Sequence, residues 1–285
     1  MREIRKVADG ARVRLSFRLS MRSAPLSGLV TLLALAGSAS ATPFPSAWLP
    51  SAGDGYMIPP TWAERGLRYG TPDLIGLVER AARAVAEDVP GATLYVADLS
   101  LKSGAVTQWH RSHRNGCDAD LFFFAEDDGG APRPLPTRMV PFDAAGVAWI
   151  TDRDGDRVRL RFDTPRNWAL VRALLTDEDT RVARIFISDA LRERLLRYAE
   201  SIDDEPEVVR RAEEALVQPS DSEAHDDHMH VRIEAPDGVT PILAADRAEV
   251  YARAVVKKGV KDHRPKPHVL VRHKKKGKKV HKKTA

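Results

Sequence analysis

Histidine and aspartate gather in two short segments of this chain. Outside residues 257–285 the chain has five histidines, and all of them fall within segments 110–120 and 225–230. Histidines that only pack in a core would be scattered, and one such cluster alone can arise by chance. Two distant clusters with ligand-like spacing are typical of a metal site that the fold assembles.

The spacing within the clusters predicts the ligands. In a β-strand, residues two apart face the same side, so His228 and His230 would project together. Gly116 permits a sharp reversal that would bring the His113 imidazole over the Asp120 carboxylate. Neutral imidazoles and a carboxylate are good zinc donors, and catalytic zinc keeps three protein ligands plus a water. We therefore predict His113, Asp120 and His230 as zinc ligands.

The remaining cluster residues suggest catalytic roles. His228 would lie close to the zinc without being needed as a ligand, which suits a general base that takes a proton from water. We place His225 with it in the catalytic group, because His225 or Asp118 would be able to orient the neighbouring side chains.

Other chemistry near these residues is less favoured. Cys117 would serve as a zinc ligand or nucleophile, but a small space-filling residue is the preferred interpretation. Ser112 beside His113 suggests a Ser–His pair, yet adjacency in sequence does not make a dyad. Segment 152–156 hints at a calcium loop, but its glycine stands fourth rather than sixth and the closing glutamate is missing. A hairpin turn is favoured there.

Hydrophobic periodicity and capping residues predict the elements that position these side chains. Helices and strands interleave, and strands with one polar face favour an antiparallel over a buried parallel sheet. We predict an α+β fold with a small, mainly antiparallel sheet flanked by helices. The predicted helices are 71–89, 164–175, 189–198 and 206–216, and the predicted strands are 93–97, 118–124, 158–162, 182–187 and 228–233.

The chain is predicted to have three parts. Residues 1–41 have the pattern of a signal peptide, with basic residues, an apolar run at 29–37 and small residues up to Ala41, and translation could instead start at Met21. The run is too short for a transmembrane span. Residues 42–256 would form one domain that contains the predicted zinc site, and residues 257–285 a basic disordered tail. We expect export to the periplasm.

Charge is divided unevenly between the body and the tail. Thirteen Lys or Arg against Asp262 alone give residues 257–285 a charge of +12, so the net +5 of the chain leaves −7 for residues 1–256. Nucleic-acid binding by the whole protein is therefore not indicated. The tail favours retention on an anionic surface such as wall polymers, lipopolysaccharide or phospholipid head groups. A single cysteine, Cys117, excludes an intramolecular disulfide.

Both clusters resemble the signatures of a known family. Segments 112–120 and 225–233 are similar to the two motifs of the penicillin-insensitive murein endopeptidases, which belong to a wider group of zinc peptidases. That group includes the D-Ala-D-Ala peptidases, lysostaphin-like enzymes and the hedgehog signalling domain. The resemblance extends over roughly residues 90–236. The chain departs from the family in lacking disulfides, and its region before His110 is not obviously alike.

The resemblance implies a fold, a site and a substrate. The fold would be the one shared with D-Ala-D-Ala metallopeptidases. His113, Asp120 and His230 correspond to zinc ligands and His228 to the catalytic base. His110 and Asp154 correspond to positions with further metal contacts. The implied substrate is peptidoglycan, cut at D-alanyl-diaminopimelate cross-links, and insensitivity to penicillin would follow because no serine nucleophile takes part.

Two other functions stay open at the level of sequence. A zinc D,D- or L,D-carboxypeptidase or amidase acting on peptidoglycan stems would use the same ligands, since ligands define the reaction class and not the bond. A non-catalytic wall-binding protein with a structural zinc and a polyanion-binding tail is the other alternative. A structural zinc has no need of a base, so His228 argues against the second alternative.

Overall fold

The computed structural model describes residues 45–110, 112–135, 137–152, 154–220 and 222–239. The predicted signal segment 1–41 and the basic tail 257–285 lie outside the described residues and stay predictions. The described elements, in chain order, are β1 (Ala47–Trp48), β2 (Ala52–Gly53), β3 (Tyr56–Met57), α1 (Pro60–Ala63), β4 (Tyr69–Gly70), α2 (Pro72–Asp88), β5 (Leu94–Tyr95), β6 (Asp118–Phe122), β7 (Ala125–Glu126), β8 (Val147–Thr151), β9 (Arg157–Phe162), α3 (Thr164–Thr176), β10 (Val182–Phe186), α4 (Asp189–Ser201), α5 (Pro206–Ala215), β11 (Leu216–Val217) and β12 (His228–Ile233).

One sheet has four strands in the order β11-β10-β12-β6. Its strand β6 contains Asp118 and Asp120, and its strand β12 contains His228 and His230. Strands β6 and β12 run antiparallel, and their register sets His230 opposite Asp120 and His228 opposite Phe122. Because side chains alternate along a strand, the acidic residues of β6 and the histidines of β12 share one face of this sheet. The other face is apolar and belongs to the hydrophobic core through the buried residues Ala119, Leu121, Met229 and Val231.

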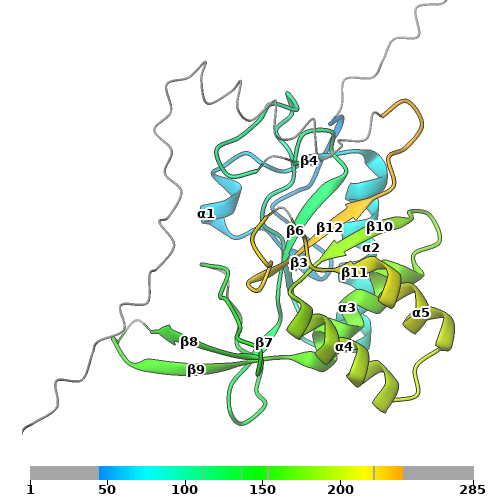
Figure 1. The fold of residues 1–285 in the computed structure, drawn as a ribbon. Coiled ribbons are helices and arrows are strands. Elements are labelled where there is room, and N and C mark those ends of the chain that lie inside the picture. The colour runs from blue at the N-terminus through cyan, green and yellow to red at the C-terminus, as the bar shows by residue number, and fades with distance from the viewer. Residues whose placement is uncertain (1–44, 111, 136, 153, 221, 240–285) are drawn as a thin grey trace, which may run out of the picture. The chain divides into compact units, whose positions relative to one another are not determined.

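Helices supply many of the remaining core residues. Figure 1 shows α2, α3, α4 and α5 gathered on one side of the described fold, beside β10 and β12. Helix α2 begins where the Thr71 hydroxyl accepts a hydrogen bond from the Leu74 backbone N–H at 3.2 Å. Each fully buried leucine contributes about 1.5–3 kcal/mol through the hydrophobic effect. The buried side chains of α2 are Leu74, Ile75, Leu77, Val78, Ala81, Ala82 and Val85.

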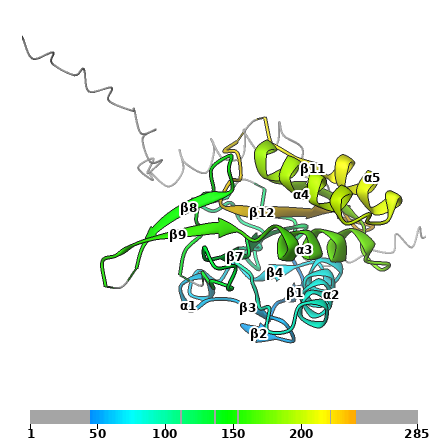
Figure 2. The same cartoon turned by 90° about the horizontal axis from the view of Figure 1, so that it is seen from below.

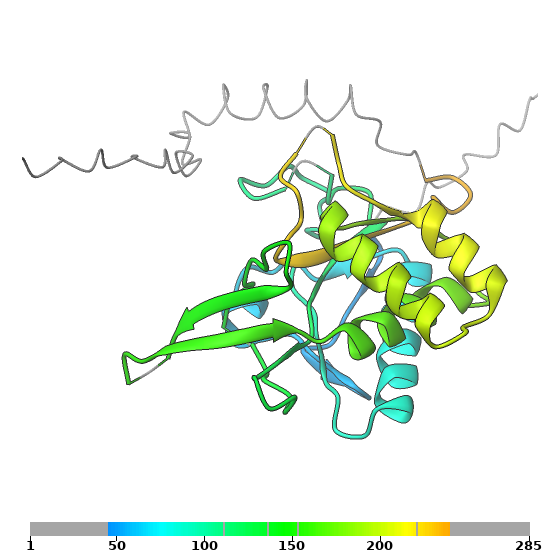
Figure 3. The same ribbon diagram turned by 60° about the horizontal axis from the view of Figure 1, so that its bottom comes forward.

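A second sheet of order β7-β9-β8 contains a long hairpin that extends away from the helices (Figures 2 and 3). Along β9 the arginines are exposed while Leu160 and Phe162 are buried, as expected for a strand with one polar face. Between β8 and β9, the Asp152 carboxylate accepts hydrogen bonds from the backbone N–H groups of Asp154 and Asp156. The segment forms the predicted hairpin turn.

The α+β fold is confirmed, and so are the predicted helices within a few residues at their ends. The strand predicted at 93–97 is shorter, with β5 covering two residues and an isolated bridge joining Val96 to Leu121. The paired segments between residues 47 and 70 were not predicted, because two-residue strands are too short to show alternation. None of the helices in the described part of the chain is long and apolar enough to cross a membrane.

Candidate metal centre

One carboxylate oxygen lies at the centre of the two clusters. Asp120 Oδ1 is 3.3 Å from His113 Nε2, 3.2 Å from His230 Nδ1 and 3.4 Å from His228 Nε2. Asp120 is 1% exposed, and its Oδ1 has no hydrogen-bond partner among the described residues. The fold thus brings together the three predicted ligands and the predicted base around a single buried atom.

The outer nitrogens of two imidazoles are held by acceptors. His113 Nδ1 lies 2.8 Å from the carbonyl oxygen of Leu99, and His230 Nε2 lies 2.7 Å from Asp118 Oδ1. Asp118 is buried and also accepts a hydrogen bond from Arg232 Nε at 2.7 Å. Carbonyl and ionised carboxylate oxygens only accept hydrogen bonds, so each outer nitrogen donates. In the neutral form of each imidazole, the inner nitrogen then presents its lone pair toward the centre.

His228 is oriented in the same way. Its Nδ1 lies 2.6 Å from Asp227 Oδ1, which directs Nε2 toward Asp120. Burial lowers the pKa of His228, but the carboxylates of Asp120 and Asp227 outweigh burial and raise it to about 10. Burial raises the pKa of Asp120, but His113, His228 and other nearby histidines hold it well below its usual range. An ionised Asp120 carboxylate therefore faces the His228 imidazole, and the negative charge of that carboxylate favours a cation at the centre.

These donor atoms fit a small metal ion. Among Asp120 Oδ1, His113 Nε2 and His230 Nδ1 the three separations are 3.2–3.3 Å. A tetrahedron with metal–ligand bonds of about 2.0–2.1 Å has edges of about 3.3–3.4 Å. Electron-rich atoms this close need a cation between them, and a metal ion competes with protons for such a site. The residues present are therefore suited to hold a metal.

His110 flanks this centre from outside. Its ring is stacked on the His113 ring with centroids 4.1 Å apart, and its Nδ1 lies 3.6 Å from Asp120 Oδ2. The ligand atoms of His110, His113 and Asp120 all lie within 4.8 Å of one another. The opposite nitrogen of His110, Nε2, lies 2.7 Å from Asp98 Oδ2.

His225 borders the centre from the other side. Its ring lies 4.9 Å from the His228 ring and 5.5 Å from the His230 ring, and its Nδ1 is 2.8 Å from the Glu223 carbonyl oxygen. Burial, together with the nearby positive charge of His228 and His230, lowers the pKa of His225 to about 4. His225 is therefore neutral at pH 7.

Three further residues considered as metal ligands or nucleophiles do not join this centre. Asp154 lies in the exposed β8–β9 turn, and the structure does not bring it together with either cluster. Cys117 is a buried core residue, and burial raises the pKa of its thiol to about 12, which disfavours a thiolate nucleophile. Both ring nitrogens of His113 have partners other than Ser112, so the described contacts give no support to a Ser–His pair.

Sequence reasoning missed Asp98, Asp227 and Arg65, which contact the cluster from outside. Asp227 stands directly before His228, so the sequence could have indicated it as a candidate partner of that histidine. Asp98 lies beside Asp120 because the backbone N–H of Asp120 donates to the Asp98 carbonyl at 3.0 Å. That pairing register depends on the fold, and no spacing in the sequence indicates it.

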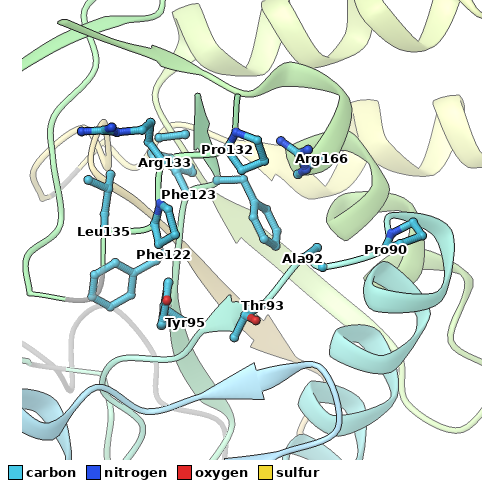
Figure 4. Close-up of a pocket in the computed structure, with 14 residues that line it drawn as sticks. Pro90, Ala92, Thr93, Tyr95, Phe122, Phe123, Pro132, Arg133, Leu135 and Arg166 are labelled. Atoms are coloured by element: carbon cyan, nitrogen blue, oxygen red, sulfur yellow. The ribbon is translucent and has the colours of Figure 1, made fainter. Parts of the chain in front are cut away.

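A cavity of about 230 Å³ lies where β6 ends (Figure 4). Its lining is largely apolar, with two arginines, and it contains none of the clustered histidines. Phe122 joins the two regions, because it lines the cavity and is paired with His228 across the β6–β12 ladder. The labelled lining residues in Figure 4 are Pro90, Ala92, Thr93, Tyr95, Phe122, Phe123, Pro132, Arg133, Leu135 and Arg166.

Comparison with known proteins gives a consistent result. The family model for penicillin-insensitive murein endopeptidase matches residues 42–251, a longer stretch than the region of resemblance expected from the motifs. Curated relatives named penicillin-insensitive murein endopeptidase are found in several bacteria.

Three of these relatives illustrate the degree of similarity. The Haemophilus influenzae protein is 28% identical over 206 residues, covering 70% of this chain and 64% of its own length. A protein of Escherichia coli O1:K1 / APEC is 27% identical over 189 residues, covering 66% and 61%. One from Klebsiella pneumoniae subsp. pneumoniae is 26% identical over 234 residues, covering 74% and 77%. The chain thus spans less than two thirds of the length of the first two.

Proposed function

Because the chain belongs to the penicillin-insensitive murein endopeptidase family, we propose that it is a zinc metalloendopeptidase that hydrolyses peptide cross-links of peptidoglycan. The relatives' shared name supports murein as the substrate. D-Alanyl-diaminopimelate bonds are the proposed cleavage point. Such a substrate requires export, and the periplasm is the proposed compartment.

The proposed zinc ligands are His113 Nε2, Asp120 Oδ1 and His230 Nδ1. The observation that carries this proposal is the convergence of these atoms on one point, with the outer nitrogen of each imidazole committed to an acceptor. When bound there, zinc supplies Lewis acidity that polarises a carbonyl and lowers the pKa of water toward about 7. Asp118 keeps His230 in the ligating tautomer.

His228 is the proposed general base. Asp227 accepts a hydrogen bond from the Nδ1–H of His228, so Nε2 faces the centre. A cation bound at Asp120 would disfavour a second proton on His228, which leaves Nε2 free to take the proton from the attacking water. The same nitrogen then returns a proton to the leaving amine. His225, neutral and packed against His228 and His230, is proposed to keep these two rings in place.

The basic tail has a separate proposed role. Its charge of +12 supports electrostatic retention on an anionic surface, whereas the acidic body gives no reason to expect nucleic acid as a partner. Binding of this kind is independent of the metal centre.

Product analysis tests the proposed activity. The purified full chain is incubated with cross-linked dimeric muropeptides, with and without a chelator, and with penicillin in a parallel reaction. We expect conversion of dimer to monomer that the chelator blocks and penicillin does not. Release of terminal D-alanine alone would indicate a carboxypeptidase, and unchanged dimer would indicate a wall-binding protein.

A further inference from the structure

We infer that Asp98 is a positioning residue for the metal centre, acting through His110 on the ligand Asp120. This inference rests on the proposed function, because it names what holds one of the proposed zinc ligands in place. Asp98 is 0% exposed and lies outside both sequence clusters.

The Asp98 side chain has two partners at one carboxylate oxygen. Its Oδ2 accepts from Arg65 Nη1 at 2.7 Å and lies 2.7 Å from His110 Nε2. Arg65 also contacts two indoles, with its guanidinium carbon 3.8 Å from the Trp62 ring centre and 4.9 Å from that of Trp109. A buried carboxylate with two such partners leaves its histidine neighbour little freedom.

The orientation of His110 determines what Asp120 can do. With Nε2 held by Asp98, the ring lies flat against His113 and turns Nδ1 toward Asp120 Oδ2. That oxygen faces away from the other three imidazoles, all of which approach Oδ1. His110 therefore hinders rotation of the carboxylate and keeps Oδ1 as the single oxygen presented to the metal.

The backbone explains why Asp98 is in reach. The N–H of Ala97 donates to the Asp120 carbonyl at 2.9 Å, and the N–H of Asp120 donates to the Asp98 carbonyl at 3.0 Å. The next carbonyl along the chain, that of Leu99, receives His113 Nδ1. One short segment thus fixes His110 through a side chain and His113 through a main-chain oxygen.

The test measures zinc affinity of the full chain by competition with a chelator. We expect D98N to bind zinc about 10-fold more weakly than the parent, the lower end of the loss seen when a direct partner of a ligand is removed, because Asp98 acts on the ligand through His110. R65Q should weaken zinc binding in the same direction, because it removes the cationic partner of Asp98 Oδ2. D177N is the matched control, because Asp177 also pairs with an arginine but lies away from the cluster.

A double variant separates positioning from a general structural effect. If Asp98 acts through His110, D98N should cause no further loss of zinc affinity in an H110A background. Equal zinc affinity of the parent and D98N would overturn this inference alone, as would full additivity with H110A. A parent chain that binds no zinc would overturn the proposed function as well.

Discussion

At the scale of single residues, the site depends on which nitrogen of each imidazole carries a proton. Leu99, Asp118 and Asp227 each engage one outer nitrogen, so the inner nitrogens point at Asp120 Oδ1 and offer lone pairs to a metal ion when the imidazoles are neutral. The inner nitrogens of His113, His230 and His228 lie 3.2–3.4 Å from that oxygen, and we propose the first two as metal ligands and the third as the base.

Replacing the proposed base should separate chemistry from metal binding. We expect H228A to cleave dimeric muropeptide at least about 100-fold more slowly than the parent, because general-base catalysis contributes about that much or more. Its zinc content, measured by atomic absorption, should be unchanged, whereas H230A should lose zinc and activity together. A zinc-loaded H228A with parental turnover would contradict the role given to His228.

At the scale of elements, the reversal before β6 brings His113 over Asp120. Gly116 has φ +77, and its carbonyl accepts a hydrogen bond from the Thr71 N–H at the start of α2. A Cβ at this position would lie 2.8 Å from the Thr71 nitrogen and 3.0 Å from Pro45 Cβ. The turn therefore needs glycine both for its backbone conformation and for its close approach to α2.

G116A should accordingly weaken both the fold and the metal site. We expect a loss of about 1–3 kcal/mol in the free energy of unfolding, since a non-glycine residue is strained at this φ, together with weaker zinc binding. G155A is the control, with φ +90 but no atom within 4 Å of the added Cβ, in an exposed turn. Chemical denaturation and chelator competition measure the two effects; a G116A chain with parental zinc affinity would show that the turn does not position His113.

A salt bridge joins α2 to the end of α3. Arg80 binds Asp177 through Nε–Oδ2 at 2.6 Å and Nη2–Oδ1 at 2.8 Å. Burial raises the pKa of Asp177, but the hydrogen bonds from Arg80 and from the Thr180 backbone outweigh burial and hold it below its usual range. A pKa lower in the folded than in the unfolded chain stabilises the fold above the unfolded pKa of about 4 and loses that contribution as pH falls through the folded value.

D177N should therefore change the acid dependence of stability. We expect it to lower the free energy of unfolding at pH 7 by about 1–2 kcal/mol, because Arg80 is partly solvent-screened. Below pH 3 the difference from the parent should shrink. Urea denaturation from pH 7 to pH 2.5 measures it, and a difference that grew toward low pH would have the wrong sign for this pair.

Elements and side-chain contacts differ in how well the sequence predicts them. The helices and the strands carrying His228, His230 and Asp120 were predictable, because their apolar periodicity extends over several residues. The contacts of Asp98 and Asp227 with the histidines were not, since one depends on β-strand register and the other on rotamers. Asp154, assigned by resemblance, lies in the exposed turn between β8 and β9 and is not grouped with either cluster in the described part of the chain.

At the scale of the whole molecule, charge and catalysis are proposed to reside in different parts of the chain. The body carries −7 and contains the metal centre, whereas residues 257–285 carry +12. Attraction between exposed charges falls with ionic strength, since the screening length is about 8 Å at 0.15 M salt. The two functions should therefore be separable by truncation.

Removing residues 257–285 should reduce co-sedimentation with vesicles containing anionic phospholipid, and the binding of the full chain should decline as salt is raised from 50 to 500 mM. Cleavage of soluble muropeptides should be unchanged, because no proposed site residue lies in the tail. Salt-independent binding that survives truncation would assign retention to the body instead.

We propose that one metal ion, held by His113, Asp120 and His230, makes this chain a peptidase. The most direct measurement is the rate of dimeric muropeptide cleavage as zinc is added back to the metal-stripped full chain, with bound zinc quantified at each point. The rate should rise in proportion to bound zinc and level off at one ion per chain. Cleavage that persists at full rate in the stripped chain, or zinc that binds without restoring cleavage, would contradict it.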